Sequence, residues 1–277
     1  MPVSVLLMVL LGAFLHAGWN LLVKIGRNAH VATANVFIGA GCLAGATLPF
    51  LPSPAVASWP YLGASVSAEL IYGVLLATAY RTGDLSLTYP LMRGTAPLLV
   101  AFASLALVGE RLSRSGWAGV SLISGGIILL VFEARSRGRS GAAFALLAAL
   151  VIATYTTIDG VGVRVSMHPI AYAFWNFALT AVPWLLWSVA RGRADRWAAL
   201  RRQLPSGFLG GACSLASYAI ALWAMTRAPV AAVAALRETS IVFGLLLGML
   251  ILHERVSRLR ALAAVAVTLG VIVMRSG

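Results

Sequence analysis

Long apolar stretches recur along the whole sequence, and they restrict the fold more than any other feature. The hydrocarbon core of a bilayer is about 30 Å thick, so a helix that crosses it needs roughly 20 apolar residues. Stretches of that length alternate here with short segments that hold most of the arginines. We predict ten transmembrane helices, at Val3–Val23, Val31–Leu51, Tyr61–Tyr80, Leu85–Val108, Gly116–Phe132, Gly141–Gly162, Ile170–Ala190, Gly207–Thr226, Val230–Leu252 and Leu259–Met274.

The composition of these stretches excludes a closed β-barrel, the other structure that can cross a membrane. Barrel strands alternate polar and apolar residues over about ten positions. These stretches are instead apolar on all sides and rich in Ala, Leu and Gly. With 60% hydrophobic and only 10% charged residues, the chain is expected to be an all-α integral membrane protein.

The chain is strongly basic, with 21 Lys+Arg against 8 Asp+Glu and a formal net charge of +13. In a soluble protein this charge would suggest a nucleic-acid partner. Here the cations lie between the apolar stretches, as they do in the loops of membrane proteins that cross the bilayer many times. The expected partner is therefore the lipid bilayer and not nucleic acid, and the oligomeric state stays open.

The polar residues lack the arrangements that catalysis or a metal site would need. There is no nucleotide-binding loop, no Ser-His-Asp grouping that the spacing supports and no metal-ligand spacing. A membrane enzyme that acts on lipid-linked substrates is the main alternative of another class, and it would need acidic or histidine clusters at the water interface. The acidic residues are scattered, and Cys42 and Cys213 lie inside apolar stretches. We therefore expect neither enzyme activity nor a cofactor or metal.

The sequence contains an internal repeat with an offset of 144 residues. This offset aligns Arg93 with Arg237, Thr95 with Thr239, and the run Glu110–Arg114 with Glu254–Arg258. The halves are residues 1–134 and 140–277, joined by a basic linker at 135–139, and each half holds five predicted spans. Because five is odd, the second copy must be inverted, which gives two halves related by a pseudo-two-fold axis in the membrane plane. This architecture is typical of transporters.

At this point the sequence resembles a known family over essentially its whole length. The segments that carry the resemblance are Tyr89–Pro97 followed by Gly109–Ser113, and Leu236–Ser240 followed by His253–Ser257. They are similar to EamA-type members of the drug/metabolite transporter superfamily. The resemblance implies a carrier in the cytoplasmic membrane that exports amino acids or other small metabolites, with a central cavity lined by both halves. A lipid-carrier flippase of the same superfamily is the alternative within transport.

The serines of the two repeated runs are expected to be helix caps. Ser113 and Ser257 stand just before the fifth and tenth predicted spans, where an N-cap side chain would accept a hydrogen bond from the first turn. Glu110 and Glu254 are interpreted as parts of tight turns at the interface and not as chemical groups.

Charged residues inside the predicted spans are the first candidates for a substrate site, because a charge in the bilayer is costly and marks function by default. They are Glu69, Arg93, Asp159, Arg237 and Glu238. Cations and anions near one depth could bind the two ends of a zwitterion such as an amino acid. The remaining candidates are polar and aromatic: His16, Trp19, Asn20, Tyr72, Tyr155, Trp175, Tyr218 and Trp223.

Two questions about these charges stay open in the sequence. The charges could instead pair with one another and hold the halves together without a ligand. Glu69 and Glu238 are also candidates for proton coupling, since a carboxylate among apolar helices can load a proton from one side of the membrane. A carrier that works by facilitated diffusion would need no such residue.

The distribution of Lys and Arg predicts the orientation in the cytoplasmic (inner) membrane. Loops on the side of the termini hold five cations: Arg111, Arg114, Arg164, Arg227 and Arg275. Loops on the other side hold fourteen: Lys24, Arg27, Arg81, Arg135, Arg137, Arg139, Arg191, Arg193, Arg196, Arg201, Arg202, Arg255, Arg258 and Arg260. The positive-inside rule therefore places both termini outside. The family resemblance implies the opposite arrangement, with both termini in the cytoplasm.

Overall fold

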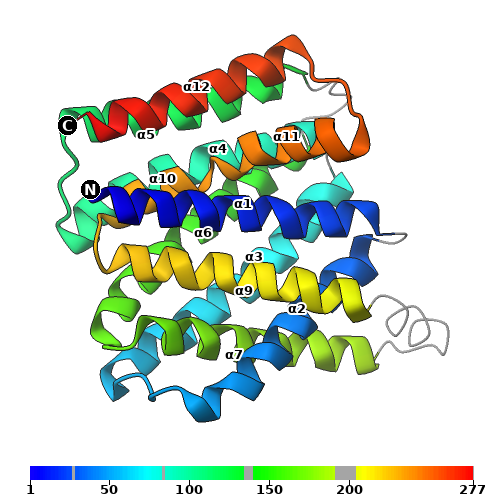
Figure 1. Cartoon of the computed structure of the whole chain (residues 1–277), viewed down its shortest axis with the longest axis vertical. Helices are drawn as coiled ribbons and strands as arrows, with labels where there is room; N and C mark the ends of the chain where they lie inside the picture. The colour runs from blue at the N-terminus through cyan, green and yellow to red at the C-terminus, as the bar shows by residue number, and fades with distance from the viewer. Residues whose placement is uncertain (27–28, 83–84, 134–139, 191–203, 277) are drawn as a thin grey trace.

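Every regular element in the described residues is a helix, as the apolar stretches predict. The structure is a computed structural model that describes residues 1–26, 29–82, 85–133, 140–190 and 204–276. The predicted linker at 135–139 lies outside the described residues. Helices from distant parts of the chain lie side by side, with their axes roughly parallel (Figure 1).

The first half of the chain forms five long helical segments. They are α1 (Val3–Ile25), α2 (Ala29–Thr47) with a 3-10 turn at Leu48–Phe50, α3 (Trp59–Thr82) after a second 3-10 turn at Val56–Ser58, α4 (Leu85–Ala103) with a π-helical turn at Ser104–Val108, and α5 (Arg114–Ile128) with a 3-10 turn at Leu129–Glu133. Pro90 and Pro97 lie inside α4 on either side of Arg93.

The second half begins with three uninterrupted helices. They are α6 (Ser140–Val165), α7 (Pro169–Ala190) and α9 (Leu204–Met225). The predicted span at 230–252 is divided into α10 (Val230–Arg237) and α11 (Ser240–Leu252), and the last helix is α12 (Arg258–Arg275). The division falls at Glu238 and Thr239, whose backbone N–H groups bond three residues back, to Ala235 and Leu236. These bonds follow the 3-10 pattern, which interrupts the α-helix beside the charged residues.

Eight helices of the described residues are long and apolar enough to cross a membrane, which supports a multi-pass membrane protein. The other two predicted spans, Tyr61–Tyr80 and Leu259–Met274, form α3 and α12. They fall outside the eight because their composition is less apolar. Helix α3 carries Ser65, Ser67 and Glu69, and α12 carries arginines at both ends.

The two halves are interleaved, and most of the packing between helices joins one half to the other. Helix α1 packs against α9 and α11 of the second half, and α6 packs against α3 and α4 of the first. Helices α2 and α7 also pack together, as do α5 and α12. Figure 1 shows α1 between α9 and the α10–α11 segment, and α5 beside α12 along one edge. Fully buried side chains of both halves, including Val9, Ile123, Leu222 and Leu236, form the shared core.

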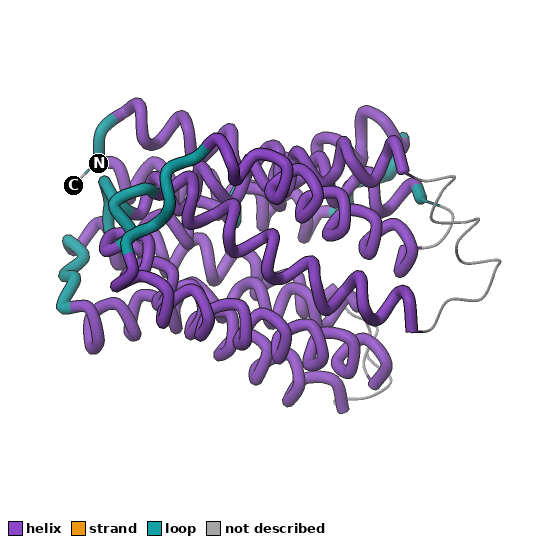
Figure 2. The backbone as a smooth tube through the Cα atoms, turned by 90° about the horizontal axis from the view of Figure 1, so that it is seen from below, coloured by secondary structure: helices purple, strands orange, loops and turns teal. Residues whose placement is uncertain are grey.

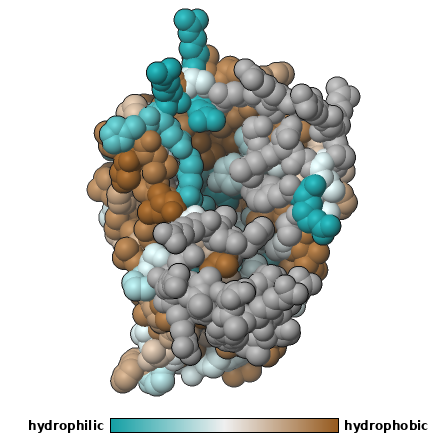
Figure 3. Space-filling view, turned by 90° about the vertical axis from the view of Figure 1, so that its right-hand side faces the viewer, coloured by the Kyte–Doolittle hydropathy of each residue, from teal (hydrophilic) through white to brown (hydrophobic). Residues whose placement is uncertain are grey.

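Both chain termini lie at one end of the bundle, which we call the terminus end (Figures 1 and 2). The opposite end includes the turn from α11 to α12, at His253–Ser257. Figure 3 looks onto this opposite end, where a band of hydrophilic residues runs inward from the rim between hydrophobic ones. The described loops thus alternate between the two ends, as the predicted spans require.

The two repeated Glu-Arg runs form matching corners, and both predicted N-caps are confirmed. Ser113 Oγ accepts a hydrogen bond from Gly116 N at 3.1 Å, and Ser257 Oγ accepts one from Arg260 N at 3.2 Å. The preceding helices end on residues with left-handed backbone, Gly109 with φ 75° and His253 with φ 55°. Such a C-terminal residue lets the chain turn sharply after a helix.

Candidate functional site

Two carboxylates from different halves meet at one tyrosine hydroxyl in the middle of the bundle. The Tyr218 hydroxyl on α9 lies 3.1 Å from Glu69 Oε1 on α3 and also donates to Asp159 Oδ2 on α6. Asp159 is 1% exposed and Tyr218 is 7% exposed. One phenol carries one proton, so it can donate to only one of these carboxylates at a time. The pair therefore has the composition of a site that holds a further proton or a cation.

Other polar side chains complete the surroundings of this carboxylate pair. Thr180 Oγ1 donates to Glu69 Oε2 at 3.0 Å, and Tyr172 OH donates to Asp159 Oδ1 at 3.1 Å. Asn176, between them on α7, donates to Ser65 Oγ of α3 at 3.4 Å. These contacts bind α7 to α3 and α6 around the carboxylates.

A second pair of charged residues joins the two halves. Arg93 Nη2 of α4 and Glu238 Oε1, just after α10, are 2.9 Å apart, and the two side chains are only 12% and 6% exposed. These two residues therefore pair with each other across the halves, which is the alternative to ligand binding that the sequence left open. Arg93 Nε and Glu238 Oε2 remain buried without a hydrogen-bond partner among the described residues.

Arg237 differs from Arg93 because no ion pair links it to an acidic residue in the described part of the chain. Its guanidinium carbon lies 5.7 Å from the centre of the Tyr218 ring, a cation–π arrangement. The side chain also borders a cavity of about 20 Å³ that Arg93, Tyr155, Thr156 and Glu238 line as well. A cavity of this size holds one or two water molecules, so a larger ligand requires the halves to move apart.

The predicted aromatic and polar residues divide into a central and a peripheral group. Tyr155 lines the cavity, and the centre of the Tyr72 ring lies 6.1 Å from the centre of the Tyr155 ring. On α1, His16 is within electrostatic reach of Arg93 and Arg237.

Trp19 and Asn20 of α1 both hydrogen-bond to His16. Trp19 Nε1 donates to His16 Nδ1 at 3.3 Å, and Asn20 Nδ2 donates to the His16 carbonyl at 2.7 Å. They thereby fix the histidine side chain and the turn of helix that holds it.

Trp175 and Trp223 lie away from the charges. Trp175 packs edge to face on Trp59 at the start of α3, with ring centres 5.0 Å apart. Trp223, near the end of α9, lies under the Arg227 guanidinium at 4.2 Å. These two residues therefore contact the ends of helices and not the central cavity.

Sequence reasoning missed Ser65, Tyr172, Thr180 and Thr156, because single hydroxyl side chains in apolar spans most often bond within the membrane bundle. A signal was nonetheless present in their spacing. Tyr172, Asn176 and Thr180 occur at four-residue intervals on α7, and Ser65 precedes Glu69 by four residues on α3. Such a polar stripe on one face of an otherwise apolar helix indicates a polar interior.

The second half of the chain, residues 139–276, matches the model of the "EamA-like transporter family". No curated protein sequence matches the chain significantly. A solved structure described only as "Crystal structure of protein" superposes with a TM-score of 0.73 at 18% identity, covering 99% of this chain and 96% of that one. At this identity the likeness concerns the fold alone.

Proposed function

Because the chain belongs to the EamA-like transporter family, we propose that it exports a small zwitterionic metabolite, with an amino acid as the simplest cargo. In this proposal the protein works by alternating access between two inverted halves of five helices each. In this proposal Arg237 binds the cargo carboxylate and the Glu69–Asp159 pair binds its ammonium group. We call the cargo site the central cluster; it consists of Glu69, Arg93, Asp159, Arg237 and Glu238. The setting is the cytoplasmic membrane.

A single observation carries this proposal: charged groups of both signs, contributed by both halves, meet inside the bundle, and Arg93, Arg237 and Glu238 line one small cavity there. Arg93 and Glu69 belong to the first half, and Asp159, Arg237 and Glu238 to the second. Charges inside a membrane protein are expensive and mark a transport pathway. The cavity holds only water in its present size, so binding and release of cargo would follow separation of the halves.

The helix packing supports the inverted-repeat part of the proposal. Under the 144-residue offset, α1 corresponds to α6, and each packs against the third and fourth helical segments of the other half. The self-paired contacts, α2 with α7 and α5 with α12, are those that a two-fold axis would place on itself. The aligned arginines, Arg93 and Arg237, both border the cavity.

The charge balance of the cluster favours coupling to protons. Two arginines face three carboxylates, so the fully ionised cluster carries one excess negative charge. A proton on the Glu69–Asp159 pair would neutralise it, and the ammonium group of an incoming cargo would displace that proton. Competition of this kind gives exchange of protons for cargo, which suits export driven by an inward proton gradient.

A thermal-stability screen of the purified protein with amino acids, peptides, phosphonates and sugars tests the function. We expect amino acids to raise the melting temperature, because a ligand stabilises the state that it binds. Arg237→Met should weaken this binding by about tenfold or more, since it removes charge-assisted hydrogen bonds. Arg227→Met, which removes an exposed arginine at the terminus end, is the matched control.

The same screen separates the carrier from the flippase alternative. A shift with lipid phosphates and none with amino acids would establish the flippase interpretation. Equal shifts for Arg237→Met and the unchanged protein would remove Arg237 from the site.

A further inference from the structure

We propose that two ion pairs at opposite ends of the bundle, Glu110–Arg164 and Glu254–Lys24, are the gating contacts of the transport cycle, so that breaking each one opens its own end. The inference rests on the proposed function for its role, but its geometry stands independently. Each pair joins the two halves, and each carboxylate follows the left-handed residue at one of the two matching corners.

The two pairs are related by the internal repeat. Glu110 and Glu254 are 144 residues apart. Their backbone N–H groups donate to the carbonyls of Ser104 and Gly248, at 3.1 Å in each case, and these two acceptors are also 144 residues apart. The cations occupy corresponding places as well. Arg164 lies in the last turn of α6, the first helix of the second half, and Lys24 in the last turn of α1, the first helix of the chain.

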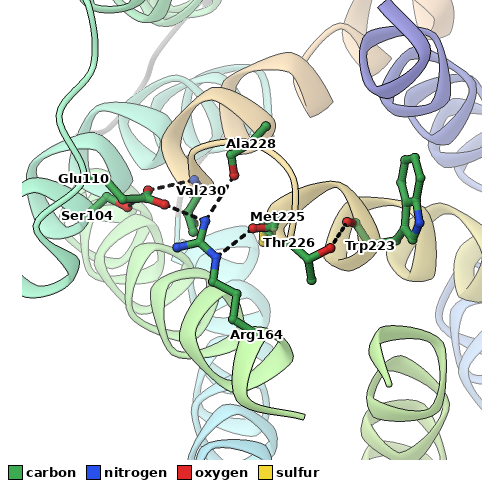
Figure 4. Close-up of polar contacts among 8 residues, drawn as sticks. All are labelled: Ser104, Glu110, Arg164, Trp223, Met225, Thr226, Ala228 and Val230. Atoms are coloured by element: carbon green, nitrogen blue, oxygen red, sulfur yellow. Dashed lines mark hydrogen bonds and ion pairs between the residues drawn. The ribbon is translucent and has the colours of Figure 1, made fainter. Parts of the chain in front are cut away.

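The pair at the terminus end is embedded in a network (Figure 4). Glu110 Oε1 lies 2.5 Å from Arg164 Nη2, and Glu110 Oε2 accepts hydrogen bonds from Ser104 Oγ and Val230 N at 2.8 Å each. Arg164 also donates to the carbonyls of Met225 and Ala228, at 2.8 and 3.1 Å. One carboxylate from the first half thus holds the end of α6 and the start of α10 together.

The pair at the opposite end is simpler and more exposed. Lys24 Nζ lies 2.6 Å from Glu254 Oε1, with side-chain exposures of 56% and 38% against 32% and 14% for Arg164 and Glu110. Gly248 stands where the first corner has Ser104, so this carboxylate lacks the matching hydroxyl. A lysine also cannot span a carboxylate and carbonyls with a planar fork as arginine does. The opposite end should therefore open more easily than the terminus end.

Access of a water-soluble, membrane-impermeant maleimide to the central cavity tests this inference without any cargo. The reporter is Ala234→Cys, which lines the cavity, in a background with Cys42→Ala and Cys213→Ala. Labelling rates are measured in spheroplasts and in inverted vesicles, which present opposite membrane faces. Separate cysteines at the exposed residues Ala57 and Val256 identify which face each end occupies.

Each pair should control labelling from its own face. We expect Glu254→Gln to raise labelling from the opposite end by about two- to fivefold, as for an exposed ion pair. Glu110→Gln should raise it from the terminus end by about tenfold, because a less exposed and more heavily bonded pair is broken. Arg255→Gln and Arg227→Met, which remove cations near the same ends, should leave both rates unchanged.

Charge exchange gives a second readout that a loss of folding could not imitate. The double variant Lys24→Glu with Glu254→Lys should restore slow labelling. Arg164→Glu with Glu110→Arg should not, because a carboxylate at position 164 could not donate to the Met225 and Ala228 carbonyls. Variants that change labelling equally from both faces, or not at all, would overturn the proposal. If labelling follows it while the protein transports nothing, the proposed function fails and the gating contacts stand.

Discussion

At the scale of single residues, the two proton-coupling candidates occupy different environments. Glu238 is within 2.9 Å of the Arg93 guanidinium, so its charge is already balanced. Glu69 has neutral donors, Thr180 and Tyr218, and it shares the latter with Asp159. A carboxylate beside another carboxylate gains more from a proton than one that is paired with arginine. We therefore favour Glu69 over Glu238 as the coupling residue.

Glu69→Gln separates coupling from binding. The amide keeps the size and one acceptor but cannot exchange a proton, so we expect the response of transport to a pH gradient to be lost while exchange of cargo across the membrane continues. Flux in proteoliposomes with and without an imposed gradient measures both. Tyr218→Phe should lower the exchange of cargo in addition to the gradient response, because it removes the hydroxyl that joins the two carboxylates. An unchanged gradient dependence in Glu69→Gln would exclude this residue.

At the scale of helices, close backbone contact fixes how the halves fit together. A Cβ on Gly39 of α2 would lie 2.7 Å from the Gly207 carbonyl oxygen of α9, and a Cβ on Gly207 would lie 2.7 Å from Asn35 Cβ. The seam between α2 and α9 therefore depends on small residues, as membrane helix interfaces commonly do. Gly244, in contrast, has open space where a Cβ would stand.

Gly39→Ala tests this seam. The added methyl group meets backbone that cannot yield, so we expect the free energy of unfolding to fall by about 1–3 kcal/mol, as for other overpacked cores. Thermal unfolding of the protein in detergent measures the change. Gly244→Ala is the matched control and should be neutral or slightly stabilising, because alanine favours helix more than glycine does. Equal melting temperatures for the two variants would contradict the packing argument.

At the scale of the whole molecule, the arrangement puts both termini and the sparsely charged loops at one end. By the spans predicted from the sequence, fourteen cations belong to loops of the other side and five to loops of the side that holds the termini. The cytoplasmic side of a membrane protein carries the excess of Lys and Arg, so this asymmetry still predicts that the termini lie outside.

A pair of C-terminal reporters tests the orientation. A fluorescent protein that matures only in the cytoplasm should stay dark, and alkaline phosphatase, which is active only outside, should give signal. The reverse result would show that the family arrangement prevails over the charge bias.

The sequence alone determined the class of protein and most of the helix boundaries, because the length of an apolar stretch is a local property of the chain. It also located the five charged residues inside the helices and both helix caps. Which charges pair could not be read from it, since Arg93 and Glu238 are 145 positions apart and meet only when the halves interleave. The contacts of Tyr218 with Glu69 and Asp159 could not be read from the sequence either. Nor could the cations that pair with Glu110 and with Glu254. Tertiary structure decided these contacts because side chains from separate helices can satisfy one another only after packing has fixed their distance and direction.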